Sequence, residues 1–182
     1  MIDPDELEMP GWKTPAMGQI KPSKLIKISK NMDDLMEFLS PEDELLDAGC
    51  FKGHLYEALH HQRYTGIDLF YDNIKEARQN FPGVRFEQKD LFDLKGKWDV
   101  VFCCRVLMHI PRFRDAISIL RRCARKKLIV VLPIGDDAML LEDVEGGRVY
   151  FRTFSEGMIQ DTGGTVRLRH PYSTAIYDPL LS

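Results

Sequence analysis

Acidic residues stand at the ends of three predicted strands, and their carboxylates are the groups in the sequence best placed to do chemistry. Asp47 ends a short apolar run, Asp68 ends the next one, and Asp90 directly follows a third. The carboxyl ends of parallel strands meet at one edge of a sheet, where such sheets bind their ligands. A carboxylate there can accept hydrogen bonds from hydroxyl or amino groups, or face a cation. We therefore expect a polar ligand at this edge.

A loop with two glycines follows the first of these acids. Gly49 and Gly53 have no side chains, and they stand just before a helical pattern that begins at His54. A ligand could therefore approach the backbone closely at these two positions. A dinucleotide-binding loop needs Gly-x-Gly-x-x-Gly, and Phe51 breaks that spacing. This disfavours a nicotinamide-dependent oxidoreductase, which stays open as an alternative. An ordinary glycine turn after a buried strand is the alternative that needs no ligand.

The loop resembles motif I of the S-adenosylmethionine (SAM)-dependent methyltransferases with a Rossmann-like fold, which usually reads acid-x-Gly-x-Gly-x-Gly. Asp47, Gly49 and Gly53 match the acid and the outer glycines, while Phe51 replaces the middle glycine. The resemblance covers roughly residues 35–178. It implies SAM as the cofactor and S-adenosyl-L-homocysteine (SAH) as the product.

The same resemblance implies a role for each acid. Asp68 lies 21 residues after Asp47, the span expected for an acid that accepts from both ribose hydroxyls. Asp90 would accept from the adenine amino group, the Leu91 N–H would serve a ring nitrogen, and Leu69 would pack on the ring. The whole predicted cofactor-binding set is Asp47, Gly49, Cys50, Gly53, Asp68, Leu69, Asp90, Leu91 and Arg105.

Two residues with basic side chains, Arg105 and His109, follow the fourth predicted strand, where the family places the methyl acceptor. His109 is the candidate catalytic base, since a neutral imidazole can take a proton as the methyl group arrives. The alternative for His109 is a packing or helix-start histidine. Arg105 either binds an anionic substrate or lends its backbone carbonyl to the methionine ammonium group.

The elements that position these residues follow from hydrophobic periodicity and turn residues. Helices are expected at 31–39, with Asn31 as N-cap, and at 54–61, 72–81, 113–124 and 155–162. Strands are expected at 44–47, 64–69, 84–88, 98–103, 127–134, 165–170 and 173–177. The order of these expected helices and strands predicts a three-layer α/β fold of Rossmann-like type. Its seven-stranded sheet is mostly parallel and ends in a C-terminal antiparallel hairpin.

The domain organisation predicted is one SAM-binding domain over residues 31–182, preceded by an irregular arm over residues 1–30. The arm carries prolines at positions 4, 10, 15 and 22 and shows no clear period. Residues 148–154 alternate charged and aromatic side chains, and we expect them to lack core periodicity. Both segments are candidates for mobile covers of the acceptor pocket.

Composition excludes several classes of protein. Hydrophobic residues make up 44% and charged residues 29% of the 182 residues, which is typical of a globular protein. The net charge of −3 offers no basic field for nucleic acid or an anionic membrane. The longest apolar run, 128–134, is too short to span a bilayer. The four cysteines form no Cys-x-x-Cys pair, so no metal site is expected. A cytoplasmic location is the expectation.

The function predicted is SAM-dependent methyl transfer to a small-molecule acceptor, mainly by positioning the reactants and with His109 as an optional base. A non-catalytic SAM-binding or partner-docking subunit is the first alternative, because the chain shows no large insertion that would build a substrate pocket. An NAD(P)-dependent oxidoreductase is the second. The accepting atom, the acceptor and the oligomeric state are left open.

Overall fold

The computed structural model describes residues 29–180 apart from 145–146 and 169–171. All but the last two residues of the predicted arm 1–30 lie outside this range. The helices are α2 (Ser29–Met36), α3 (His54–Leu59), α4 (Tyr71–Asn80), α5 (Phe113–Cys123) and α6 (Glu156–Asp161), with the short 3-10 helices η1 (Leu91–Asp93) and η2 (Leu107–His109). The strands are β1 (Leu45–Ala48), β2 (Tyr64–Asp68), β3 (Arg85–Gln88), β4 (Trp98–Cys104), β5 (Ala124–Leu132), β6 (Met139–Val144), β7 (Gly147–Arg152), β8 (Thr165–Arg167) and β9 (Ser173–Tyr177).

Seven strands form one sheet in the order β3-β2-β1-β4-β5-β9-β8. The first five strands run parallel, while β9 is antiparallel to both β5 and β8. The predicted mostly parallel sheet with a C-terminal antiparallel hairpin is therefore confirmed. The strand order reverses direction between β1 and β4, and the crevice at such a reversal is where open α/β sheets bind ligands.

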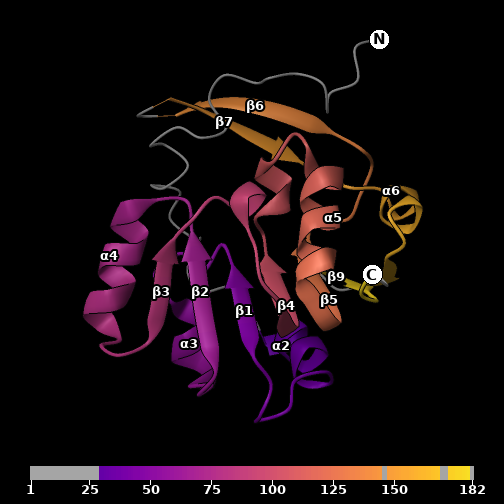
Figure 1. Cartoon of the computed structure of the whole chain (residues 1–182). Coiled ribbons are helices and arrows are strands. Elements are labelled where there is room, and N and C mark those ends of the chain that lie inside the picture. The colour runs from indigo at the N-terminus through magenta and orange to yellow at the C-terminus, as the bar shows by residue number, and fades with distance from the viewer. Residues whose placement is uncertain (1–28, 145–146, 169–171, 181–182) are drawn as a thin grey trace.

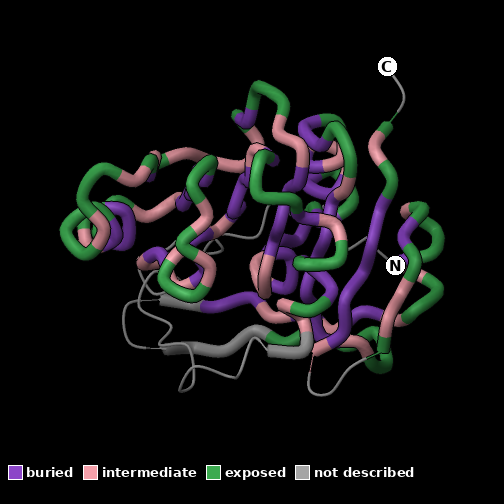
Figure 2. Tube along the Cα trace, turned by 90° about the horizontal axis from the view of Figure 1, so that it is seen from below, coloured by how far each residue is buried: buried purple, intermediate pink, exposed green. Residues whose placement is uncertain are grey.

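Helices cover both faces of this sheet, as the prediction of three layers requires (Figure 1). Alternate residues of each central strand enter opposite cores, because strand side chains point to the two faces in turn. On β4, Val101 and Cys103 pack in the core beneath α5. Val100 and Phe102 pack in the core formed with α2, α3 and α4. β1 and β2 are consequently buried along their whole length, and β4 is buried in its middle (Figure 2).

A second, two-stranded sheet was not predicted. β6 and β7 pair antiparallel and lie above the carboxyl ends of the parallel strands (Figure 1). The expectation that residues 148–154 lack core periodicity is wrong, since Tyr150, Arg152 and Phe154 are all buried. The Arg152 guanidinium stacks on the Phe113 ring at 5.0 Å and pairs with Asp137. Charged residues are rarely buried, so alternating charged and aromatic residues in the sequence are typical of a solvent-exposed segment. Here the cation Arg152 is buried, and the sequence pattern does not predict that.

The start of α2 also differs from the prediction. The helix begins at Ser29, before the predicted N-cap Asn31. The Asn31 side chain bonds to β9 instead, donating to Thr174 Oγ1 at 2.8 Å. Thr174 in turn donates to the buried carboxylate of Asp34 at 2.6 Å. These contacts attach α2 to the C-terminal hairpin, a tertiary role that competes with local capping.

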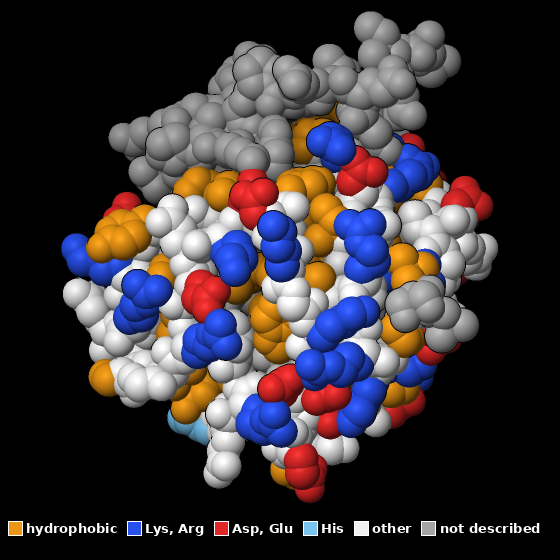
Figure 3. All heavy atoms as spheres, viewed as in Figure 1, with side chains coloured by type: hydrophobic (Ala, Val, Ile, Leu, Met, Phe, Trp, Pro, Cys, Tyr) orange, Lys and Arg blue, Asp and Glu red, His pale blue; other side chains and the backbone are white. Residues whose placement is uncertain are grey.

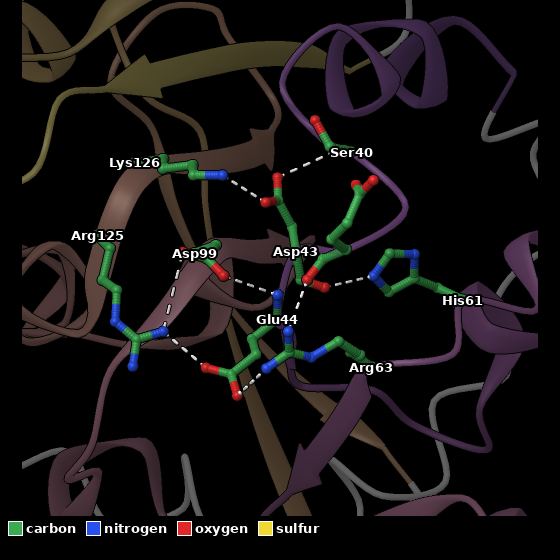
Figure 4. A network of polar contacts seen from close by, with 9 residues as sticks. Ser40, Asp43, Glu44, His61, Arg63, Asp99, Arg125 and Lys126 are labelled. Atoms are coloured by element: carbon green, nitrogen blue, oxygen red, sulfur yellow. Dashed lines mark hydrogen bonds and ion pairs between the residues drawn. The ribbon is translucent and has the colours of Figure 1, made fainter.

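A polar network closes the opposite, amino-terminal edge of the sheet (Figure 4). The Glu44 carboxylate pairs with Arg63 and Arg125 at 2.8 and 2.6 Å. Buried Asp43 accepts from the Ser40 N–H and pairs with Lys126. The network joins the starts of β1, β2 and β5, and it lies away from the acids at the strand ends.

Charges of both signs share the face that carries α4 and α5 (Figure 3). Lys52 pairs with Glu76 of α4 at 2.6 Å, and Arg112 donates to Asp115 of α5. Exposed pairs of this kind contribute little stability. Among the described residues, no helix is long and apolar enough to cross a membrane.

Candidate functional site

Four loops and the β6–β7 hairpin surround the carboxyl edge of the sheet. The loops follow β1, β2, β3 and β4, and they carry every residue of the predicted site apart from Asp47 and Asp68, which lie in β1 and at the end of β2. η2 packs against β7 of the hairpin. The structure therefore brings the predicted residues to one edge of the sheet, on both sides of the reversal in strand order.

Asp47 lies within β1 and is buried, with 3% of its surface exposed. Its Oδ2 accepts from the Tyr64 hydroxyl at 2.6 Å, and no other hydrogen bond of this carboxyl is found in the described part of the chain. Burial raises the pKa of Asp47 to about 7, although the Tyr64 hydrogen bond opposes the shift. The nearby charge of Asp68 raises it further. A cation brought to Asp47 would favour the carboxylate over the neutral acid.

The glycine loop after β1 has an unusual backbone. Gly49 and Gly53 have φ of 86° and 87°, and Phe51 between them also has a positive φ of 50°. A non-glycine residue in this region is uncommon and is held there by its surroundings. The loop thus keeps a glycine-like backbone at the position where motif I has its middle glycine. The Phe51 ring lies 5.5 Å from that of His54.

The two outer glycines are needed for packing within the protein. A Cβ on Gly49 would lie 2.2 Å from Cγ2 of Val106, in the loop after β4. A Cβ on Gly53 would lie 2.9 Å from the Phe81 ring and 3.0 Å from the Phe86 ring. The space beside these glycines is occupied by protein side chains, so the missing side chains are no direct evidence of a ligand. The interpretation of these two glycines as space for a ligand stays a prediction.

Asp68 fixes the loops on both sides of it. Its Oδ2 accepts from the Phe51 N–H at 2.9 Å, and its Oδ1 accepts from the Phe70 N–H at 2.9 Å and from Asn73 Nδ2 at 3.1 Å. Burial raises the pKa of Asp68, and these three hydrogen bonds oppose the rise. A carboxylate offers about four acceptor positions, so one remains for a ligand hydroxyl.

The third acid and its neighbours lie at the end of β3. The Asp90 side chain caps η1, with Oδ1 accepting from the Phe92 N–H at 3.0 Å. Leu91 is half-buried and packs against the core beneath α5. The Leu69 carbonyl accepts from Gln88 Nε2 at 3.2 Å, which ties the ends of β2 and β3 together. Asp90 and Leu69 are thus brought to neighbouring strand ends, as expected.

Cys50 lies inside the loop. Its side chain is buried, and desolvation together with the charges of Asp47 and Asp68 raises the pKa of the thiol far above its ordinary value. A buried thiol that stays protonated is a poor nucleophile, so Cys50 is not a candidate for covalent catalysis.

Arg105 leaves β4 with a positive φ of 57°. Its N–H donates to the Val131 carbonyl at 2.7 Å, and its guanidinium lies 5.3 Å from the centroid of the Tyr172 ring. The Tyr172 carbonyl accepts from Asn31 at 3.3 Å. Tyr172 therefore joins α2, β9 and the loop after β4, a contact that was not predicted from the sequence.

His109, at the end of η2, is held by β7. Its Nδ1 lies 2.9 Å from the Tyr150 carbonyl oxygen. A carbonyl can only accept, so Nδ1 carries the proton and Nε2 has the free lone pair. The Phe151 ring packs edge-on at 6.0 Å. Burial lowers the pKa of His109 and the charge of Arg105 lowers it further, against the Tyr150 hydrogen bond.

Several residues of the site were missed in the sequence. Tyr64 and Asn73 bind the two acids Asp47 and Asp68, and Tyr150 holds His109. The position of Tyr64 at the start of β2, opposite Leu45 of β1, could have suggested a contact with the neighbouring strand. Nothing in the local sequence connects Tyr150 with His109. Within the described residues, no group of three or more His, Cys, Asp or Glu is arranged to hold a metal ion.

Two curated proteins are similar to this chain in sequence. The ubiquinone biosynthesis O-methyltransferase of Histophilus somni is 30% identical over 146 residues, which are 67% of this chain and 58% of that protein. The mitochondrial ubiquinone biosynthesis O-methyltransferase of Saccharomyces cerevisiae is 32% identical over 94 residues, or 46% of this chain and 29% of that protein. The chain thus matches 58% or less of the length of these two relatives.

Solved structures give the same fold at lower sequence identity. The magnesium protoporphyrin IX methyltransferase of Synechocystis with bound SAM has a TM-score of 0.62 and 24% identity, over 82% of this chain and 78% of that one. A SAM-dependent methyltransferase from Methanosarcina mazei has a TM-score of 0.67 and 18% identity, over 82% and 98%. The sequence profile of the methyltransferase domain matches residues 39–162. The chain therefore belongs to the methyltransferase domain family and has the Rossmann-like fold of the class I SAM-dependent methyltransferases.

Proposed function

We propose that this protein is an enzyme that transfers a methyl group from SAM to a hydroxyl group of a small-molecule acceptor. The observation that carries the proposal is the set of acids on three successive strand ends, in a chain of this family. The relatives named as O-methyltransferases support a hydroxyl acceptor. We further propose a cytoplasmic protein whose residues 31–182 form one SAM-binding domain, with 1–30 as its arm.

The residues fit SAM by their chemistry. Asp47 is a buried carboxyl with one oxygen that forms no hydrogen bond in the described structure, which suits the ammonium of the methionine part. Asp68 keeps one acceptor position for a ribose hydroxyl. Asp90, the Leu91 N–H and Leu69 would hold the adenine, and the backbone of Gly49, Cys50, Gly53 and Arg105 would line the methionine part. When bound, SAM supplies an electrophilic methyl group.

The protein mainly has to align the acceptor and keep water away from it. The β6–β7 hairpin lies above the strand ends and brings Tyr150 and Phe151 next to His109. It would provide a wall on the acceptor side, which weakens the argument that a chain without a large insertion is a non-catalytic subunit. With its proton fixed on Nδ1, His109 can take the proton of the acceptor hydroxyl on Nε2.

Calorimetric titration tests the proposal. SAM and SAH should bind, and NAD should not. Incubation with isotope-labelled SAM and a panel of hydroxylated aromatic compounds should then label at least one compound. Binding of NAD in place of SAM would favour the oxidoreductase alternative. Binding of SAM without transfer to any acceptor would favour the non-catalytic subunit.

Replacement of His109 with glutamine should lower turnover about a hundredfold, the usual contribution of a general base. The lowered pKa of His109 keeps the imidazole neutral at neutral pH. Wild-type turnover should therefore stay level at neutral pH and fall only in acid, below the ordinary histidine pKa of about 6.5. His109→Gln should lose this acid limb. Steady-state rates from pH 5 to 8 measure both effects.

His60→Asn is the matched control for this experiment. His60 ends α3 with a positive φ of 49°, which asparagine tolerates, and it lies outside the proposed site. Its variant should keep the wild-type pH profile. Full activity of His109→Gln would leave positioning as the catalytic device of this protein.

A further inference from the structure

Arg105 differs from most other arginines of the described structure. Arg63, Arg85 and Arg112 each pair with a nearby carboxylate. No carboxylate of the described residues lies within ion-pair distance of the Arg105 guanidinium, although the residue is half-buried and stands at the carboxyl edge of the sheet. A partly desolvated cation without a counter-charge is unfavourable in the unliganded protein.

The surroundings of Arg105 hold it in place without neutralising it. Its backbone is fixed by the hydrogen bond to Val131, and its guanidinium lies over the Tyr172 ring. Among the described groups whose pKa is shifted, Cys104 and His109 respond to the charge of Arg105, and the charge of Asp47 also acts on Cys104. Burial raises the pKa of Cys104 to about 11, against the effect of Arg105, so the thiol is neutral. The His109 imidazole is neutral as well, because its pKa is lowered.

In the described structure, the side chains shown to lie near the Arg105 guanidinium are therefore aromatic or neutral, and the acid Asp47, whose charge also reaches Cys104, is the one assigned above to the ammonium group of the cofactor. Tyr172 lies on one side of it, while His109 and its neighbour Phe151 lie toward the hairpin. A guanidinium presents a planar set of donors that matches the two oxygens of a carboxylate. The flanking rings suit a flat, apolar body attached to that carboxylate.

We propose that Arg105 binds a carboxylate group of the methyl acceptor, which makes the acceptor a hydroxylated aromatic acid. This inference rests on the proposed function, because it describes the acceptor side of the same site. It also separates the two roles considered for Arg105, since the side chain would bind the acceptor while the backbone carbonyl is left for the cofactor.

Benzoate and benzamide are suitable probes, because they share a ring and differ in charge. His109 can be followed by NMR titration of the full chain saturated with SAH, with His109→Gln to assign its signal. Bound benzoate should raise the pKa of His109, because an anion near the imidazole favours its protonated form. Benzamide should leave that pKa unchanged.

Arg105→Met should weaken benzoate binding about tenfold or more, the loss expected for hydrogen bonds between charged groups. Arg105→Lys keeps the charge but loses the planar donors, so its benzoate affinity should lie between that of Arg105→Met and that of the wild type. Arg122→Met removes an equal charge from the exposed end of α5 and should bind benzoate as the wild type does.

The inference is overturned if benzoate leaves the His109 pKa unchanged, if benzamide has the same effect, or if Arg105→Met binds benzoate normally. SAH affinity is measured on every variant. Failure of SAH to bind the wild type would contradict the proposed function itself. Normal SAH binding without discrimination between the two probes would remove only the carboxylate site.

Discussion

Replacement of Gly49 with alanine should destabilise the protein by roughly 2–4 kcal/mol, the combined size expected for left-handed backbone strain and an overpacked contact. The residue has φ of 86°, and an added Cβ would lie 2.2 Å from Val106 Cγ2. Either the loop after β1 or the loop after β4 would have to move, and both belong to the proposed cofactor site. Urea unfolding of the two proteins measures the difference in the free energy of unfolding.

Two further variants separate the causes of this effect. Gly83 has nearly the same φ of 88°, but a Cβ there would meet nothing within 4 Å, so Gly83→Ala should show the strain alone, about 1 kcal/mol. Val106→Ala should recover part of the stability of Gly49→Ala in the double variant. If Gly49→Ala were no worse than Gly83→Ala, the packing against Val106 would not matter.

Replacement of Asp68 with alanine should weaken SAM binding by at least roughly 1.5–3 kcal/mol, the range for hydrogen bonds to a charged group. The loss should exceed that of a single ligand contact, because Asp68 also holds the Phe51 and Phe70 N–H groups. Without it the glycine loop loses an anchor, and Phe51 loses a contact that favours its positive φ. Calorimetry with SAM measures the affinity of the wild type and the variant.

Asn73→Ala serves as the control for this experiment. It removes one of the three hydrogen bonds to Asp68 and leaves the carboxylate in place, so SAM affinity should change little while thermal stability falls. An Asp68→Ala variant that lost stability but bound SAM normally would make Asp68 a structural residue only. The ribose role implied by the sequence would then be incorrect.

Much of the fold could be predicted from hydrophobic patterning. β4 and β5 are apolar on both faces because they lie in the middle of a sheet covered by helices, and Ser155 caps α6 as expected. The hairpin β6–β7 could not be predicted in this way. Arg152 looks like a solvent-facing cation in the sequence, and only its contacts with Asp137 and Phe113 explain its burial.

Site residues could be predicted where their position follows from the local sequence. They could not be predicted where their role depends on contact between two segments that are distant in the sequence. The strand-end positions of Asp68 and Asp90 follow from local pattern. Phe51, which has a positive φ, donates its N–H to the Asp68 carboxylate, and an added Cβ at position 49 would collide with Val106. These contacts arise from packing between loops, and the hydrophobic periodicity of a single segment does not predict them.

The position of β9 in the sheet affects how the chain must be assembled. β9 lies between β5 and β8, and it is the last strand in the described sequence. During synthesis, β5 therefore has its open edge exposed until Ser173–Tyr177 leaves the ribosome. Five consecutive apolar residues, Leu128–Leu132, are all buried in the finished sheet. An open, apolar strand edge invites pairing with other chains, so the nascent protein passes through a stage in which chaperone binding competes with aggregation.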